Sequence, residues 1–248
     1  MSASLATLTS MAYEIGSTWR KWDLHIHTPE SHAAHYGANS WDRFIEDLAA
    51  LPPELSVLGI NDYLWVEGYE KVLAARAEGL LPKIDAVFPV IELRLDDFIG
   101  TTSHLARLNA HVIFAPDTPA DLIRVQFLGQ LGARFRLRDS YAHLQKTWNA
   151  LPTRDSLAQL GALIKESVPE KERDKYGPDH IEGFNNWVIP LLDVLEAMNN
   201  SSFQEKPLLG LGKTEWADIP WGDNTIAAKR NLVSEADLLF TAGLRQTL

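Results

Sequence analysis

The stretch that decides the fold is Trp22-Asp23-Leu24-His25-Ile26-His27-Thr28-Pro29, near the N-terminus of the 248-residue chain. Apolar residues stand at every second position from Trp22 to Ile26, which predicts a short strand. Two histidines at i and i+2 of a strand point the same way, with Cα atoms about 6.5 Å apart. Thr28-Pro29 indicates a turn, which places the pair at the carboxyl end of the strand, where α/β barrels build their sites. The pattern indicates either an imidazole metal site or two solvent-facing histidines on an edge strand.

Outward from this stretch, predicted strands alternate with predicted helices. Further strands are predicted at residues 55–60, 86–95, 110–115, 207–211 and 236–241. Helices are predicted at residues 41–51, 67–78, 118–131, 155–167, 190–198 and 224–233, the third of them capped by Thr118. This alternation predicts an α/β fold with a parallel sheet or barrel.

The domain organisation is predicted to be simple. Residues 1–16 form an N-terminal tail, and residues 17–248 form a single α/β barrel. Residues near 132–186 lack a regular pattern over most of their length and are expected to be an irregular excursion, not a second domain. No closing helix follows the last predicted strand, so we expect the barrel to be cut short at its C-terminal end.

Composition restricts the chemistry that the chain can carry. There is no cysteine, which excludes disulfides, thiolate zinc sites and cysteine nucleophiles. Imidazole and carboxylate ligands remain, and they suit Mn, Zn, Fe or Mg. The net charge of −10 disfavours partners such as bulk nucleic acid and anionic membranes. Because no apolar run approaches the roughly 20 residues of a membrane span and no signal peptide is recognisable, we expect a cytoplasmic protein without a membrane partner.

Polar residues in or beside the predicted strands extend the candidate site. Asp62 follows the apolar strand 55–60, and Glu92 lies inside an apolar run, where a carboxylate is costly to bury unless it is paired or binds a metal. His111 lies in the next strand, and Asp23 is placed to accept a hydrogen bond from a histidine ring. Three of these residues have an ordinary explanation when taken alone. Asp62 could form a turn, Glu92 could pair with a nearby arginine, and His111 could be a core histidine.

Two further features concern phosphate binding. Arg94 shares a strand face with Glu92 and is expected either to clamp a phosphate oxygen or to neutralise that carboxylate. The segment 209–214 resembles part of a nucleotide-binding P-loop, but the prolines at 207 and 220 are incompatible with that loop and its helix. Lys213 and Glu215 either face the site or lie in a salt-bridged surface loop, and the surface loop is favoured.

Taken in order, these residues resemble the PHP (polymerase and histidinol phosphatase) domain. The resemblance is carried by Asp23-Leu-His-Ile-His-Thr, a strand ending at Asp62, and then Glu92 and His111 in successive strands. It implies a distorted (β/α)7 barrel with a cluster of divalent metal ions that hydrolyses phosphoesters. The implied metal ligands are His25, His27, Glu92 and His111. Asp62 is implied as a ligand or as the acceptor that orients water, and Arg94 as the group that positions the phosphate.

A closer resemblance is to the N-terminal PHP-like region of TrlF-type AAA-like ATPases, some of which are linked to anti-phage defence. The shared stretches are residues 16–29, 61–63 with 67–69, 88–96 and 212–216. This implies that the chain is the N-terminal part of a larger protein, with a C-terminal ATPase region as its partner. A homo-oligomer and a phosphoester or nucleic-acid substrate are also implied.

The sequence departs from active PHP phosphoesterases at two points. Tyr63 stands where these enzymes carry a histidine, and no Asp-x-His motif follows the last predicted strand. The departures leave two hypotheses open. One is a metal-dependent phosphoesterase or nuclease-type domain; the other is a catalytically degenerate PHP module that serves oligomerisation or regulation of an attached ATPase.

Overall fold

The computed structural model describes residues 20–31, 36, 40–101, 104–116, 118–136, 150–213, 215–216 and 226–240. The predicted tail at residues 1–16 lies outside these ranges. No helix within them is long and apolar enough to cross a membrane.

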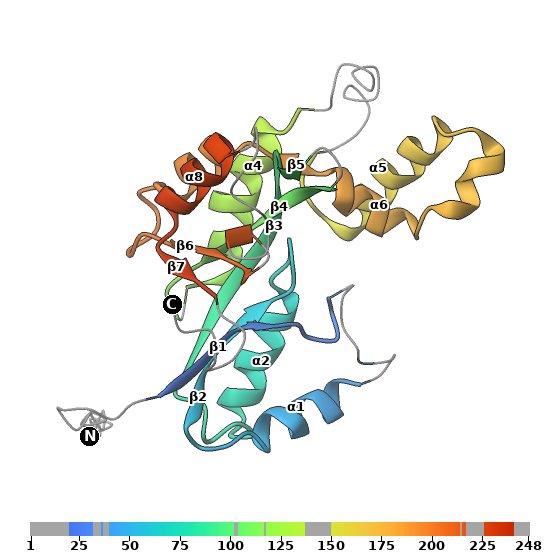
Figure 1. The fold of residues 1–248 in the computed structure, drawn as a ribbon. Helices are drawn as coiled ribbons and strands as arrows, with labels where there is room; N and C mark the ends of the chain where they lie inside the picture. The colour runs from blue at the N-terminus through green and yellow to red at the C-terminus, as the bar shows by residue number, and fades with distance from the viewer. Residues whose placement is uncertain are drawn as a thin grey trace, which may run out of the picture.

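One curled sheet organises the described chain (Figure 1). Its strands are β1 (Lys21–Ile26), β2 (Leu55–Asn61), β3 (Ala86–Thr101), β4 (His104–Ile113), β5 (Val188–Ile189), β6 (Leu208–Leu211) and β7 (Leu238–Leu239). The order is β1-β2-β3-β4-β6-β7, and β5 pairs with β3 beyond the end of β2. Among the described residues, β1 and β7 are the two edges of the sheet. The fold is therefore a mixed α/β structure with a curled sheet, consistent with a partial (β/α) barrel whose described strands do not close into a ring.

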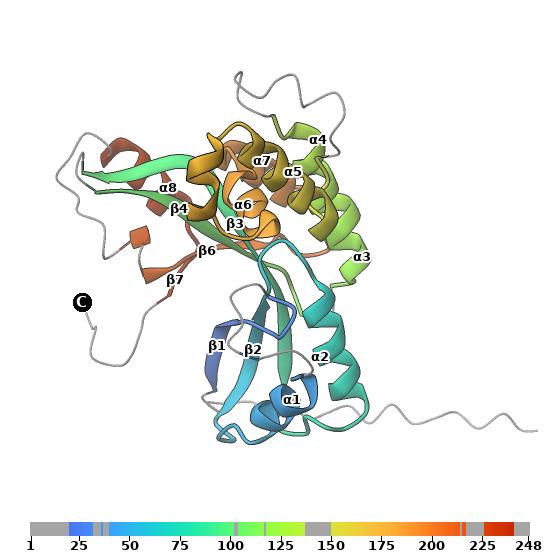
Figure 2. The ribbon, with the colours of Figure 1, turned by 90° about the vertical axis from the view of Figure 1, so that its right-hand side faces the viewer.

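Helices connect most of these strands and cover the sheet (Figure 2). They are α1 (Trp41–Ala49), α2 (Glu67–Ala77), α3 (Ala120–Leu122), the π-helical turn η1 (Ile123–Leu128), α4 (Gly129–Arg134), α5 (Arg154–Glu166), the 3-10 helix η3 (Glu170–Lys175), α6 (Asp179–Asn186), α7 (Leu191–Met198) and α8 (Ile226–Glu235). Helices α1 and α2 pack with β2 around a smaller core. A larger core lies between β3, β4, β6 and helices η1 to α7.

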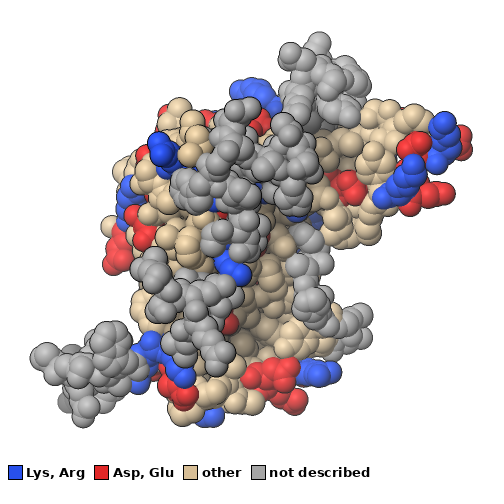
Figure 3. All heavy atoms as spheres, in the orientation of Figure 1, with Lys and Arg blue, Asp and Glu red and all other residues tan. Residues whose placement is uncertain are grey.

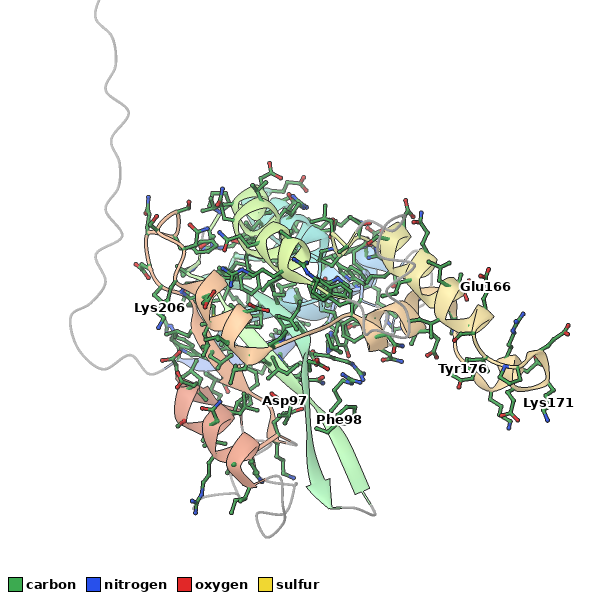
Figure 4. The ribbon with its side chains drawn as sticks, turned by 90° about the horizontal axis from the view of Figure 1, so that it is seen from above. Asp97, Phe98, Glu166, Lys171, Tyr176 and Lys206 are labelled. Carbon is green, nitrogen blue, oxygen red and sulfur yellow. The ribbon has the colours of Figure 1, made fainter. Side chains whose placement is uncertain are left out.

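The long hairpin of β3 and β4 corrects the predicted parallel sheet. Only residues 102–103 separate the two strands, so they must run antiparallel. Asp96 and Asp97 lie within β3, at an irregularity between the pairs Arg94–Asn109 and Phe98–Arg107, where three residues of β3 lie opposite one of β4. Figure 4 shows Asp97 and Phe98 where the hairpin leaves the body of the molecule.

Two helices begin at other residues than the sequence predicts, and local hydrogen bonds explain where they begin. Helix α3 begins after Pro119 and not after Thr118, whose hydroxyl donates to the Ala115 carbonyl. Helix α5 begins at Arg154, because Thr153 and Ser156 form a reciprocal capping box at its N-terminus. The 3-10 helix η3, helix α6 and strand β5 were missed by the sequence prediction.

Helices α5 and α6 form an arm that projects from the body, with Glu166, Lys171 and Tyr176 at its outer end (Figure 4). Charged side chains of both signs cover that end (Figure 3). The two helices touch backbone to backbone. A Cβ atom on Gly161 would lie 1.8 Å from the Asp179 carbonyl oxygen, and one on Gly183 would lie 1.8 Å from the Leu157 carbonyl oxygen. The described part of the predicted irregular excursion is thus an ordered helical pair whose packing requires glycine at both contacts.

We expect Gly183→Ala to destabilise the protein by about 1–3 kcal/mol, because backbone atoms leave no room for the added methyl group. The free energy of unfolding from urea titration measures this loss. The matched control is Gly177→Ala, whose methyl group would meet side chains and no backbone, the nearest being the flexible Glu182 carboxylate at 3.3 Å. Equal stability of Gly183→Ala and Gly177→Ala would contradict the close helix contact.

Candidate metal centre

The predicted histidine pair lies at the carboxyl end of β1. His25 is the next-to-last residue of the strand, and His27 follows the strand directly. The Asp23 carboxylate accepts a hydrogen bond from the backbone nitrogen of His25 at 3.1 Å, not from a histidine ring as the sequence suggested. Burial lowers the pKa of His25, and the charge of Asp23 opposes this only in part. The ring is therefore neutral at physiological pH and offers a lone pair.

Three potential ligand atoms converge at this point. His25 Nε2 and His27 Nε2 are 3.2 Å apart, and Glu92 Oε2 lies 3.6 Å from the first and 3.9 Å from the second. A circle through these atoms has a radius of about 2.1 Å, which matches the bond lengths of about 2.0–2.2 Å that zinc makes to nitrogen and oxygen. Of the ligand-type side chains in the described ranges, these three form the group compact enough to hold one ion.

Glu92 is the buried member of the group and comes from the middle of β3. The residue is 4% exposed, and burial raises the pKa of its carboxyl group to about 7. Two side-chain amides act against that rise. Asn61 at the end of β2 donates to Oε2 at 2.9 Å, and Asn109 on β4 donates to Oε1 at 3.1 Å. Both bonds stabilise the carboxylate form, which is the form that binds a cation.

His111 lies opposite Glu92 in the β3–β4 ladder, so both side chains project from the same face of the sheet. Its ring is buried, 4.8 Å from the ring of His25 between centroids, and Nδ1 has no hydrogen-bond partner in the described structure. Burial and the two neighbouring histidines hold its pKa well below the usual value. His111 is therefore a neutral neighbour of the three-atom group but does not belong to it.

Asp62 follows β2 directly, and each of its two carboxylate oxygens accepts a hydrogen bond from Thr28. The carboxylate is fully buried and accepts hydrogen bonds from the Thr28 backbone nitrogen at 2.7 Å and the Thr28 hydroxyl at 2.5 Å. A Cβ atom on Gly68 would lie 1.8 Å from Asp62 Oδ2, so glycine is required there. Asp62 is outside the three-atom group. This arrangement ties the turn after β1 to the end of β2 and the start of α2.

Tyr63 stands beside the centre where a histidine was expected. Its ring stacks on the ring of His27, with centroids 5.0 Å apart and planes 22° apart. Burial and the charge of Glu92 raise its pKa to about 12, so the phenol is neutral at physiological pH. Tyr63 thus packs against a candidate ligand as an uncharged side chain.

Arg94 and Glu215 complete the charged surroundings. The charge of Arg94 opposes the rise in the pKa of Glu92. The Arg94 guanidinium lies over the ring of Phe184, 5.2 Å from its centroid. Glu215 is 6% exposed, and its carboxylate accepts the backbone nitrogen of Asn109 at 3.3 Å. The favoured surface loop was therefore wrong for Glu215, which lies inward and raises the pKa of Glu92 by its charge.

Sequence reasoning missed the residues that orient the candidate ligands. The amides of Asn61 and Asn109 reach Glu92 through sheet pairing, and the Ser31 hydroxyl lies 3.1 Å from His27 Nδ1. Partners of this kind fix the ring tautomer and the carboxylate orientation around a metal. Of these three residues, only Ser31 could have been found from spacing alone, because it lies four residues after His27, across the predicted turn.

The residues present fit a divalent cation. Two imidazole nitrogens only 3.2 Å apart must share a proton or a cation, because two facing lone pairs repel each other. The donors are two imidazoles and a buried carboxylate, a set that suits zinc, manganese or iron. The cluster therefore suggests a divalent metal, whose identity the donors alone do not fix.

Comparison with known proteins adds little to this geometry. No protein-family model and no curated protein matches the chain. Among solved structures, the chain is similar to a proposed metal-dependent phosphoesterase from Bifidobacterium adolescentis. The identity is 16% and the TM-score is 0.39, over 89% of this chain and 76% of that chain. At this level of similarity the match carries no conclusion about the site.

The contact between Asp62 and Thr28 predicts a pH dependence of stability. Burial raises the pKa of Asp62 from 3.8 to about 6, so the folded chain holds this proton to a higher pH than the unfolded chain does. Protonated Asp62 therefore stabilises the folded state by up to about 3 kcal/mol below pH 4. This stabilisation is lost as the pH rises through about 6. We expect Asp62→Asn to lack this loss.

The measurement is the free energy of unfolding from pH 4 to pH 8 for wild type and Asp62→Asn. Glu92 titrates in both proteins, so its contribution cancels in the difference. The variant of the exposed Asp97, Asp97→Asn, is the control and should follow the wild-type curve. Parallel curves for Asp62→Asn and wild type would show that Asp62 is not protonated preferentially in the fold.

Proposed function

We propose that this chain is a PHP-like domain that binds a divalent metal ion through His25, His27 and Glu92 and acts as a metal-dependent phosphoesterase. The convergence of the three ligand atoms within 3.9 Å of one another carries the proposal. The resemblance of residues 16–29 and 88–96 to the PHP-like region of TrlF-type ATPases supports it. His111, with its unpartnered buried nitrogen, is proposed as a further ligand that joins on a small movement of its ring.

When bound, the ion would lower the pKa of water and neutralise charge on a phosphoryl oxygen. The chain itself supplies the orientation. Asn61 and Asn109 donate to the Glu92 carboxylate and so favour its charged form, and the Ser31 hydroxyl lies within hydrogen-bond distance of His27 Nδ1. Arg94 lies on the same strand face as Glu92, two residues further along, and is proposed to position a phosphate. Because both oxygens of Asp62 are held by Thr28, we assign Asp62 to shaping the site and not to orienting water.

A second candidate is a degenerate module that retains the metal but not catalysis. It is favoured by Tyr63, which stacks on His27 where active relatives are expected to present another ligand. On the sequence resemblance alone, we also propose that the domain works with an attached ATPase region in the cytoplasm. Anti-phage defence, a homo-oligomer and a nucleic-acid substrate rest on the same resemblance.

Metal analysis of the purified protein tests the proposal. After dialysis against Zn²⁺, Mn²⁺, Fe²⁺ or Mg²⁺, we expect stoichiometric metal in wild type. Affinity should fall by more than about 100-fold in His25→Ala and Glu92→Gln, because outer partners alone are worth about 10–100-fold. His180→Ala removes an exposed histidine on α6 and should bind metal like wild type.

Hydrolysis of p-nitrophenyl phosphate, its bis ester and single-stranded DNA by the metal-loaded protein separates the two candidates. Turnover that is lost in His25→Ala and Glu92→Gln supports the phosphoesterase. Metal binding without turnover supports the degenerate module. Wild-type protein that takes up none of the four metals would exclude both.

A further inference from the structure

Tyr63 adopts a backbone conformation that a tyrosine rarely takes. Its φ is 60°, in the left-handed region, and within the described ranges it is the non-glycine residue with positive φ. Such a conformation is strained for a bulky side chain and persists only where the surroundings enforce it. Here both neighbours in sequence constrain the chain, since Asp62 is tied to Thr28 and Leu64 is buried in the core.

The strain places the Tyr63 ring between two other rings. One face stacks on His27, and the ring meets Phe184 of α6 in an edge-to-face contact, with centroids 4.6 Å apart and planes 71° apart. Phe184 is fully buried, so it provides a fixed support from the arm. Tyr63 therefore cannot turn away from His27 without losing both contacts.

His27 needs such support more than His25 does, because it lies just beyond the end of β1, where no strand pairing fixes it. Two of its contacts bear on the orientation of the His27 ring. Ser31 lies 3.1 Å from Nδ1 and Tyr63 covers one face, so the opposite nitrogen, Nε2, points toward His25 and Glu92.

We propose that Tyr63 is a positioning residue of the metal centre: its ring, held in the left-handed conformation and supported by Phe184, fixes the plane of the His27 imidazole. This inference rests on the proposed metal binding and deepens it. It gives Tyr63 a role at the position where a metal ligand was expected. We assign this role to the aromatic ring, whose contacts with His27 and Phe184 are the basis of the inference.

Three variants separate the ring from the backbone conformation. Tyr63→Phe keeps the ring, Tyr63→Leu keeps the strain but removes the ring, and Tyr63→Gly removes the ring and relieves the strain. The probe is Co²⁺, whose visible spectrum reports the geometry of its ligands. Tyr176→Leu, which alters an exposed tyrosine at the outer end of the arm, is the control (Figure 4).

We expect Tyr63→Phe and Tyr176→Leu to bind Co²⁺ within about 2-fold of wild type and with the same spectrum. Tyr63→Leu and Tyr63→Gly should bind about 10-fold or more weakly, with an altered spectrum, as for lost outer partners of a metal site. Melting curves of Tyr63→Leu and Tyr63→Gly should show both variants folded at the temperature of the titration, so that weaker binding is not explained by unfolding.

A readout without metal makes the inference independent of catalysis. In the metal-free protein, the proton resonances of the His27 ring should carry a ring-current shift that Tyr63→Phe keeps and Tyr63→Leu loses. Unchanged Co²⁺ affinity and spectrum in Tyr63→Leu and Tyr63→Gly would overturn the inference, as would a loss in Tyr63→Phe equal to that in Tyr63→Leu. Wild type that binds no metal would instead remove the proposed function, and this inference with it.

Discussion

The burial of the Glu92 carboxylate is the constraint on which the rest of the centre depends. An ionised carboxylate that is 4% exposed is costly unless it is hydrogen-bonded or paired. Here it is approached from three other strands: by His25 in β1 and His27 just after it, by Asn61 from β2 and by Asn109 from β4. The sheet order β1-β2-β3-β4 makes this possible, because the strand that carries Glu92 lies next to β2 and β4.

The same burial determines what the centre can bind. Desolvation raises the pKa of Glu92 and lowers the pKa of His25 and His111, so every charged form is penalised in the protein alone. Glu215 adds a second negative charge near Glu92. A divalent cation would reverse these penalties, since it favours carboxylate and neutral imidazole at once. The buried carboxylates and imidazoles together therefore indicate a cation site more strongly than any one of these residues does.

The sequence identified the site where the signal was local and failed where it depended on pairing. His25, His27 and Glu92 were predicted because their positions within short apolar strands are visible in the chain, and the structure brings the three together. Asn109 was missed because its approach to Glu92 follows from the antiparallel register of β3 and β4, which the hairpin and the irregularity in β3 determine. The inward position of Glu215 depends likewise on β6 lying beside β4.

The number of protein ligands bears on whether such a centre is catalytic or structural. Structural zinc sites use four protein ligands, whereas catalytic sites use three and leave a position for water or substrate. Within the described residues, three ligand atoms converge on one point. The carboxylate of Asp62, just after β2, is hydrogen-bonded to Thr28. Tyr63 covers one side of His27 without offering a charged ligand. A divalent ion held by His25, His27 and Glu92 alone would leave room for water or substrate, whereas the addition of His111 would give the four protein ligands of a structural site.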